Sequence, residues 1–107
     1  ATVYFRNSKA KNRSFLTTLF VSCYYLPMNL LITGGAGFIG SHFVLRHCDN
    51  NVGETVVLDK LTYAADKSYL APVLDRITFV EGDIVEQYLV NTLIKENEIE
   101  AIVNFAA

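Results

Sequence analysis

Apolar and polar positions beyond residue 27 form two kinds of segment. Four short runs are almost continuously apolar, as is typical of parallel strands covered on both faces: residues 29–33, 55–58, 77–81 and 101–107. Between them, apolar residues recur every three or four positions, which predicts helices over 38–48 and 85–97. A loop and a short irregular helix are expected after residue 59. This order predicts an α/β fold, a Rossmann-like parallel sheet with flanking helices.

The first predicted strand runs directly into a glycine turn, Gly34-x-x-Gly37-x-x-Gly40, at the start of the first helix. The unpaired N–H groups and the dipole of a helix N-terminus favour an anion such as a pyrophosphate. We expect Gly34 to permit the tight turn, Gly37 to let phosphates approach the backbone, and Gly40 to let the helix pack closely on the strand. Because the usual fingerprint has a shorter first gap, the glycines alone could also form an ordinary loop.

The second predicted strand ends in an acidic residue, Asp59. It follows Gly40 by 19 residues, close to the spacing of the carboxylate that binds the adenosine ribose in dinucleotide-binding folds. A carboxylate there accepts hydrogen bonds from both ribose hydroxyls and repels a 2′-phosphate, so NAD is favoured over NADP, although Lys60 beside it weakens this preference. The alternative is an acid that simply opens a surface loop. Together with the strand and the glycine turn, Asp59 favours a nucleotide site.

Composition excludes several classes of function. The 107 residues are 51% hydrophobic with a formal net charge of −2, which suits one small folded domain and gives no general attraction for nucleic acid or an anionic membrane. Cys23 and Cys48 form neither a disulfide framework nor a metal-ligand spacing, so we expect reduced thiols, no metal site and a cytoplasmic protein. His42 and His47 are interpreted as parts of a packing helix rather than as catalytic residues.

Residues 1–27 differ in character from the rest. A basic stretch without acids precedes an apolar-leaning run at 15–26, the layout of a secretory signal, but the run is too short for a membrane span and no small-residue cleavage site follows. An extension without function, with Met28 as the true start, is favoured over a targeting or anchoring segment. Residues 28–107 are then the N-terminal part of an NAD-binding Rossmann domain.

The third predicted strand is closed by Gly82-Asp83-Ile84. Asp83 and Glu86 have the N-cap and N3 spacing of a capping box, so Asp83 is expected to start the helix that follows. Val85, Leu89 and Leu93 are expected to share the buried face of that helix.

The string Asp59-Lys-Leu-Thr-Tyr-Ala, with Leu70-Ala-Pro-Val downstream, resembles the dTDP-glucose 4,6-dehydratases. These are NAD-dependent members of the extended short-chain dehydrogenase/reductase superfamily, whose glycine spacing this chain shares. The resemblance covers residues 28–107 and departs at Ala65-Asp66-Lys67, where members usually carry Gly-Asn-Leu. It implies a cofactor site in which the pyrophosphate meets Gly34, Gly37, Phe38, Ile39 and Gly40. The ribose side would meet Asp59, Lys60, Leu61 and Thr62. The adenine would meet Asp83 and Ile84, and Ala106 would lie beside the cofactor.

The resemblance also implies a whole enzyme, a homodimeric hydro-lyase that converts dTDP-glucose to its 4-keto-6-deoxy product with NAD used catalytically. The catalytic Tyr-x-x-x-Lys pair and the acid–base pair come later in such enzymes, so we expect no catalytic residue here and an inactive, truncated N-terminal fragment. Tyr63 and Lys67 have the Tyr-x-x-x-Lys spacing, but they follow the ribose-binding acid, and we interpret the match as coincidence. Two alternatives stay open, a UDP-glucose 4-epimerase-like enzyme and a non-catalytic dinucleotide-binding module.

Overall fold

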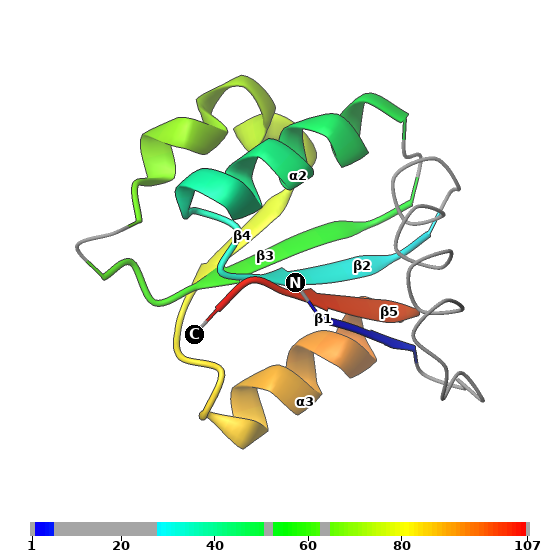
Figure 1. Cartoon of the computed structure of the whole chain (residues 1–107). Coiled ribbons are helices and arrows are strands. Elements are labelled where there is room, and N and C mark those ends of the chain that lie inside the picture. The colour runs from blue at the N-terminus through cyan, green and yellow to red at the C-terminus, as the bar shows by residue number, and fades with distance from the viewer. Residues whose placement is uncertain (1, 6–27, 51–52, 63–64, 107) are drawn as a thin grey trace.

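A computed structural model describes residues 2–5, 28–50, 53–62 and 65–106 (Figure 1). Within these residues, five strands form one sheet in the order β1-β5-β2-β3-β4. Helix α2 and the 3₁₀ helix η1 lie on one face of the sheet and α3 lies on the other, which gives three layers. In chain order the elements are β1 (Thr2–Phe5), β2 (Leu30–Thr33), α2 (Phe38–Asn50), β3 (Thr55–Asp59), η1 (Lys67–Arg76), β4 (Thr78–Glu81), α3 (Gln87–Glu96) and β5 (Ala101–Asn104).

The four strands from β2 to β5 are parallel, and this part of the predicted fold is confirmed. Leu31 of β2 is the register partner of both Val56 in β3 and Ile102 in β5. Every residue of β2 and β3 is buried, which explains why their sequences are continuously apolar. The order β4-β3-β2-β5 is that of one half of a doubly wound sheet, and its carboxyl ends meet at one edge.

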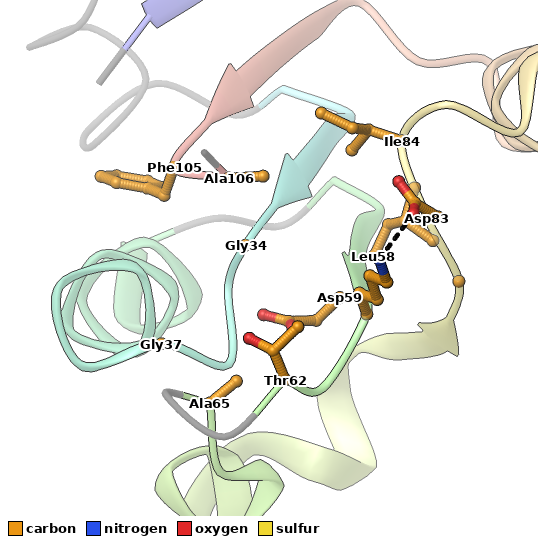
Figure 2. A pocket seen from close by; sticks show the side chains of 12 residues that line it. Gly34, Gly37, Leu58, Asp59, Thr62, Ala65, Asp83, Ile84, Phe105 and Ala106 are labelled. Carbon is orange, nitrogen blue, oxygen red and sulfur yellow. Dashed lines mark ion pairs between the residues drawn. The ribbon is translucent and has the colours of Figure 1, made fainter.

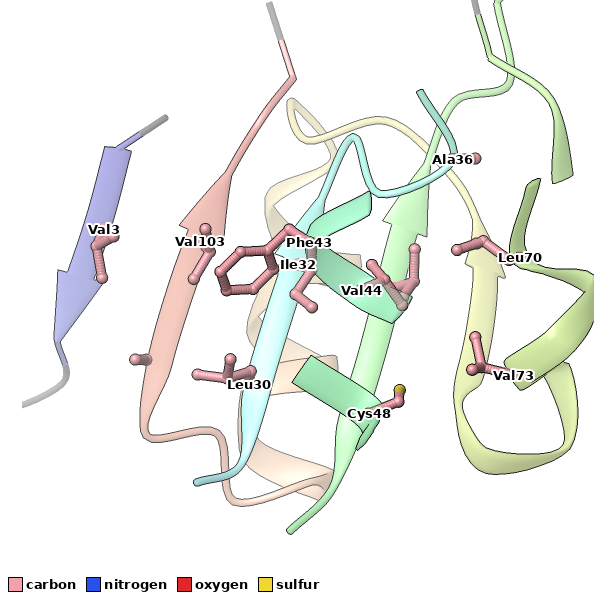
Figure 3. Close-up of a cluster of buried hydrophobic side chains, with 12 residues drawn as sticks. Val3, Leu30, Ile32, Ala36, Phe43, Val44, Cys48, Leu70, Val73 and Val103 are labelled. Atoms are coloured by element: carbon pink, nitrogen blue, oxygen red, sulfur yellow. The ribbon is translucent and has the colours of Figure 1, made fainter. Parts of the chain in front are cut away.

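Helix α2 packs on this sheet through Phe43, Val44 and Cys48, which share the main core with residues of β2 and β3 (Figure 3). His47 is buried beside Phe43 with the two rings stacked 6.0 Å apart, a packing position as interpreted from the sequence. Ile39 lies four residues before Phe43, a spacing that predicts the same buried face, but its side chain is 68% exposed, so this prediction from the sequence is wrong. It lies in the first turn of α2, which follows the glycine turn at the carboxyl edge of the sheet.

Helix α3 begins at Gln87, two residues later than predicted. One of the two bonds of the predicted capping box forms, from Asp83 N to Glu86 Oε1 (3.0 Å). Asp83 Oδ1 accepts from Val85 N (3.1 Å) and not from Glu86 N, which donates to the backbone oxygen of Asp83. They close a turn that precedes the helix, and Glu86 itself takes the N-cap position without a side-chain capping bond. Val85 therefore lies in the turn and is 78% exposed, so its predicted place on the buried face is wrong.

Strand β1 comes from the segment that the sequence favoured as an extension without function. It pairs antiparallel with β5, with Val3 opposite Val103, and so makes the sheet mixed. Val3 is only 8% exposed and joins the core on the side of α2 (Figure 3), whereas Tyr4 is 55% exposed. This alternation is typical of a strand at a sheet edge.

Replacing Val3 by aspartate is expected to detach β1 and to lower the free energy of unfolding by roughly 1.5–3 kcal/mol, because a charge would enter the core. Urea unfolding measures the loss, and amide hydrogen exchange in β5 should accelerate. The matched control is Tyr4→Asp, which adds the same charge at an exposed position of the same strand. Equal stability losses in the two variants would show that Val3 does not hold β1 in place.

No helix in the described part of the chain has both the length and the apolar character needed to cross a bilayer.

Candidate functional site

A pocket of about 520 Å³ opens at the carboxyl ends of the parallel strands (Figure 2). This is the edge at which open α/β sheets bind ligands, next to the point where the strand order reverses. Segments from four strand ends, the glycine turn and the loop after β3 build its walls. The lining residues are Gly34, Gly37, Leu58, Asp59, Lys60, Thr62, Ala65, Gly82, Asp83, Ile84, Phe105 and Ala106.

The glycine turn forms the floor of this pocket. Gly34 has a φ of 73°, and a Cβ atom there would lie 2.6 Å from the backbone nitrogen of Ala106, so only glycine fits. A Cβ on Gly37 would meet only the Gly34 carbonyl oxygen, at an ordinary 3.5 Å, and its absence leaves the floor open. Gly40 was expected to pack on the strand, but a Cβ there would overlap the Gly34 carbonyl oxygen. Its close partner is therefore the turn itself.

The N-terminus of α2 follows this floor. Ser41 N donates to Gly37 O over 2.8 Å, the first bond of the helical ladder. The N–H groups of residues 38–40 precede that bond, as at any helix start, and they are donors for an anion. The side chains of Phe38 and Ile39 are exposed and outside the pocket lining, and the Phe38 ring contacts His42 and Tyr69. Phe38 and Ile39 can therefore serve the site through their backbone alone.

Asp59 joins the floor to the next wall. Its buried carboxylate accepts two backbone hydrogen bonds of 2.8 Å, from Ala36 N in the glycine turn and from Leu61 N in the following loop. Each oxygen keeps a further lone pair, so the group can also accept bonds from hydroxyls of a ligand. Leu61, whose N–H donates to Asp59, has a φ of 56°, an unfavourable left-handed conformation for leucine.

The wall formed by the loops after β3 and β4 contains an ion pair. Lys60 Nζ lies 3.1 Å from Asp83 Oδ2, so the loops after β3 and β4 meet across the pocket (Figure 2). The Val85 N–H and, to a smaller extent, the Lys60 ammonium group hold the pKa of Asp83 below its ordinary value. Ile84 follows Asp83 and adds an apolar surface to the same wall.

The wall opposite is the end of β5, which sequence reasoning covered only through Ala106. Asn104 Oδ1 accepts bonds from the Thr33 hydroxyl (2.6 Å) and from Ala106 N (3.0 Å), and Phe105 N donates to Thr33 O (2.8 Å). Asn104 thereby fixes residues 105 and 106 against the glycine turn. The sequence signal that could have revealed Asn104 is that it is a polar residue near the end of an apolar run, as Thr33 is at the end of the first strand.

Eight of the twelve predicted site residues line the pocket. The other four, Phe38, Ile39, Gly40 and Leu61, are not among the lining residues. Tyr63, Cys23 and most of the N-terminal extension lie outside the described residues. Among the residues that the structure describes, no three His, Cys, Asp or Glu side chains gather closely enough to hold a metal ion.

A parallel half-sheet with a glycine turn, an acid on the second strand and a pocket at the carboxyl edge is the arrangement found in doubly wound α/β domains that bind dinucleotides. The chain belongs to the family described as GDP-mannose 4,6 dehydratase, whose family model matches residues 31–107.

Within the family, the chain is similar to several dTDP-glucose 4,6-dehydratases. The chain is 51% identical over 81 residues to the dTDP-glucose 4,6-dehydratase of Mycolicibacterium smegmatis, a match that covers 75% of this chain and 24% of the relative. It also resembles two solved dTDP-glucose 4,6-dehydratases. DesIV of Streptomyces venezuelae, with NAD and TYD bound, gives 47% identity and a TM-score of 0.68 over 75% of this chain and 26% of that one.

The Bacillus anthracis enzyme, in complex with NAD, gives 39% identity and a TM-score of 0.66, over 75% of this chain and 27% of that one. The resemblance inferred from the Asp-Lys-Leu-Thr-Tyr-Ala string is thus confirmed. The chain spans about a quarter of the length of these relatives.

Proposed function

We propose that the pocket binds NAD and that residues 28–107 are the cofactor-binding portion of a dTDP-glucose 4,6-dehydratase. The observation that carries the proposal is the Asp59 carboxylate, fixed by two 2.8 Å bonds beside a glycine floor with an open Gly37 position. NAD, when bound, would supply reversible hydride transfer. The residues present in this chain bind and orient the cofactor.

Each wall of the pocket fits one part of a dinucleotide. The glycine turn and the backbone of Phe38 and Ile39 offer N–H donors to the pyrophosphate. Asp59 offers acceptors to the ribose hydroxyls, with Lys60, Leu61 and Thr62 beside it. The adenine would lie against Asp83 and Ile84, and the small side chain of Ala106 would leave room for the cofactor to pass.

The whole protein is proposed to convert dTDP-glucose to its 4-keto-6-deoxy product, as a homodimer in the cytoplasm. Support comes from the 51% identity to a dTDP-glucose 4,6-dehydratase and from the solved relatives that hold NAD. We infer that the residues that act on the sugar lie outside this chain, because the chain spans only about a quarter of the length of its dehydratase relatives.

Titration calorimetry of the purified chain with NAD and NADP tests the cofactor assignment. NAD is expected to bind and NADP to bind more weakly, because Asp59 repels a 2′-phosphate. Absence of any heat with NAD, or equal affinity for NADP, would contradict the proposal. Turnover of dTDP-glucose and UDP-glucose by the whole gene product would distinguish a dehydratase from a UDP-glucose 4-epimerase.

A further inference from the structure

Lys60 has a position that the cofactor assignment leaves unexplained. It follows Asp59 directly and is the one cationic side chain among the described residues that line the pocket. A cation near the ribose is the group by which dinucleotide sites accommodate the 2′-phosphate of NADP. Lys60 on its own would therefore work against the selectivity that Asp59 provides.

In the structure, the charge of Lys60 is already paired with that of Asp83. Lys60 Nζ lies 3.1 Å from Asp83 Oδ2, and the carboxylate is the less exposed partner, with side-chain exposures of 26% for Asp83 and 65% for Lys60. The turn after β4 holds Asp83 in this orientation from two sides. Its Oδ1 accepts a bond from Val85 N, and its own N–H donates to Glu86 Oε1. Oδ2 is left to face the lysine.

We propose that Asp83 determines the specificity for the cofactor and that it acts through Lys60. Because Lys60 is paired with Asp83, this cation of the pocket lining is not available to bind a phosphate at the 2′ position of the ribose. The proposal rests on the proposed function, because it concerns selectivity within the same NAD site. The selectivity for NAD over NADP would then have two sources, the direct repulsion of a 2′-phosphate by Asp59 and the indirect effect of Asp83 at the end of a second strand.

The test is a double-mutant cycle in which calorimetry on the full chain measures the affinities for NAD and NADP. Asp83→Asn removes the charge and keeps Oδ1 for the Val85 N–H, and it is expected to raise the NADP-to-NAD affinity ratio about two- to five-fold, the range of a partly exposed ion pair. Lys60→Met in the same background should abolish this gain. Any contact of Asp83 with the adenine cancels in the ratio, because both cofactors carry adenine.

Lys67→Met is the matched charge control. Lys67 lies over the Phe79 ring, 4.8 Å from its centroid, and is not among the lining residues, so the Asp83→Asn gain should survive this substitution. The gain should also shrink as salt is raised, because the exposed Lys60 is screened. An unchanged ratio in Asp83→Asn, or a gain that persists in the Lys60→Met background, would overturn the proposal.

An NMR titration of Asp83 gives a readout that needs no cofactor. A carboxylate whose folded-state pKa is lowered keeps its pair at neutral pH and loses it as the pH falls through that pKa. Lys60→Met should raise the pKa part of the way, because the Val85 N–H remains. No change would refute the ion pair and the inference with it. A wild-type chain that binds neither dinucleotide while Lys60→Met raises the Asp83 pKa would refute the proposed function instead.

Discussion

Asp59→Ala is expected to lower the free energy of unfolding by roughly 2–5 kcal/mol and to abolish NAD binding. The carboxylate accepts bonds from Ala36 N, which is buried, and from Leu61 N, which is partly buried. Its removal leaves both backbone donors without this partner, at about 1–3 kcal/mol each. The left-handed Leu61 also loses the bond that offsets its strain. Urea unfolding followed by circular dichroism measures the first effect and calorimetry the second.

Asp59→Asn separates the two roles if the alanine variant does not fold. The amide retains one acceptor oxygen, so about half of the stability loss is expected, while one backbone donor then faces an NH₂ group. Asp66→Ala is the control elsewhere in the chain. Asp66 also accepts a backbone bond, from Ser68 N, but it is exposed, and its loss should stay below about 1 kcal/mol. If Asp59→Ala were no more damaging than Asp66→Ala, the carboxylate would not be what holds the glycine turn.

The second large effect is expected at Gly40, where alanine should cost about 2–3 kcal/mol of stability. Its Cβ would overlap the Gly34 carbonyl oxygen, which is backbone in a turn that is itself packed on Ala106. The better helix propensity of alanine, about 1 kcal/mol, offsets only part of this. Thermal and urea unfolding measure the loss.

Gly37→Ala is the matched partner of that experiment. Its Cβ would make only an ordinary 3.5 Å contact, so stability should change by less than about 0.5 kcal/mol. The methyl group would enter the pocket floor, so the affinity for NAD should fall about tenfold, or 1.4 kcal/mol. A Gly37→Ala chain that is as destabilised as Gly40→Ala would contradict the division of roles between the two glycines.

The parts of the site that could be predicted from the sequence depend on local signals. The glycine with a φ of 73° and the carboxylate at the end of a buried strand each occupy a position that the residue type and the spacing along the chain predict. The parallel sheet was predictable for the same reason, since strands buried on both faces have continuously apolar sequences.

The remaining features depend on contacts between distant segments. The Asp59–Ala36 bond and the Lys60–Asp83 pair each join two strand ends, and no pattern within either segment signals them. Leu61 adopts a conformation that leucine rarely takes, so its residue type gives no warning. The capping-box pattern of Asp83 and Glu86 predicted the bond from Asp83 N to Glu86 Oε1 but not the start of the helix, because that bond closes a turn that precedes Gln87.

Strand β1 has a consequence for how the domain is made. Thr2 pairs with Asn104, so the first and last strands of the described fold are register partners separated by almost the whole chain. The ribosome releases β1 well before β5, so the emerging chain must hold β1 without its register partner until β5 appears. Contacts of such long range form late. We therefore expect β1 to join the sheet only after β5 has been synthesised and has paired with β2.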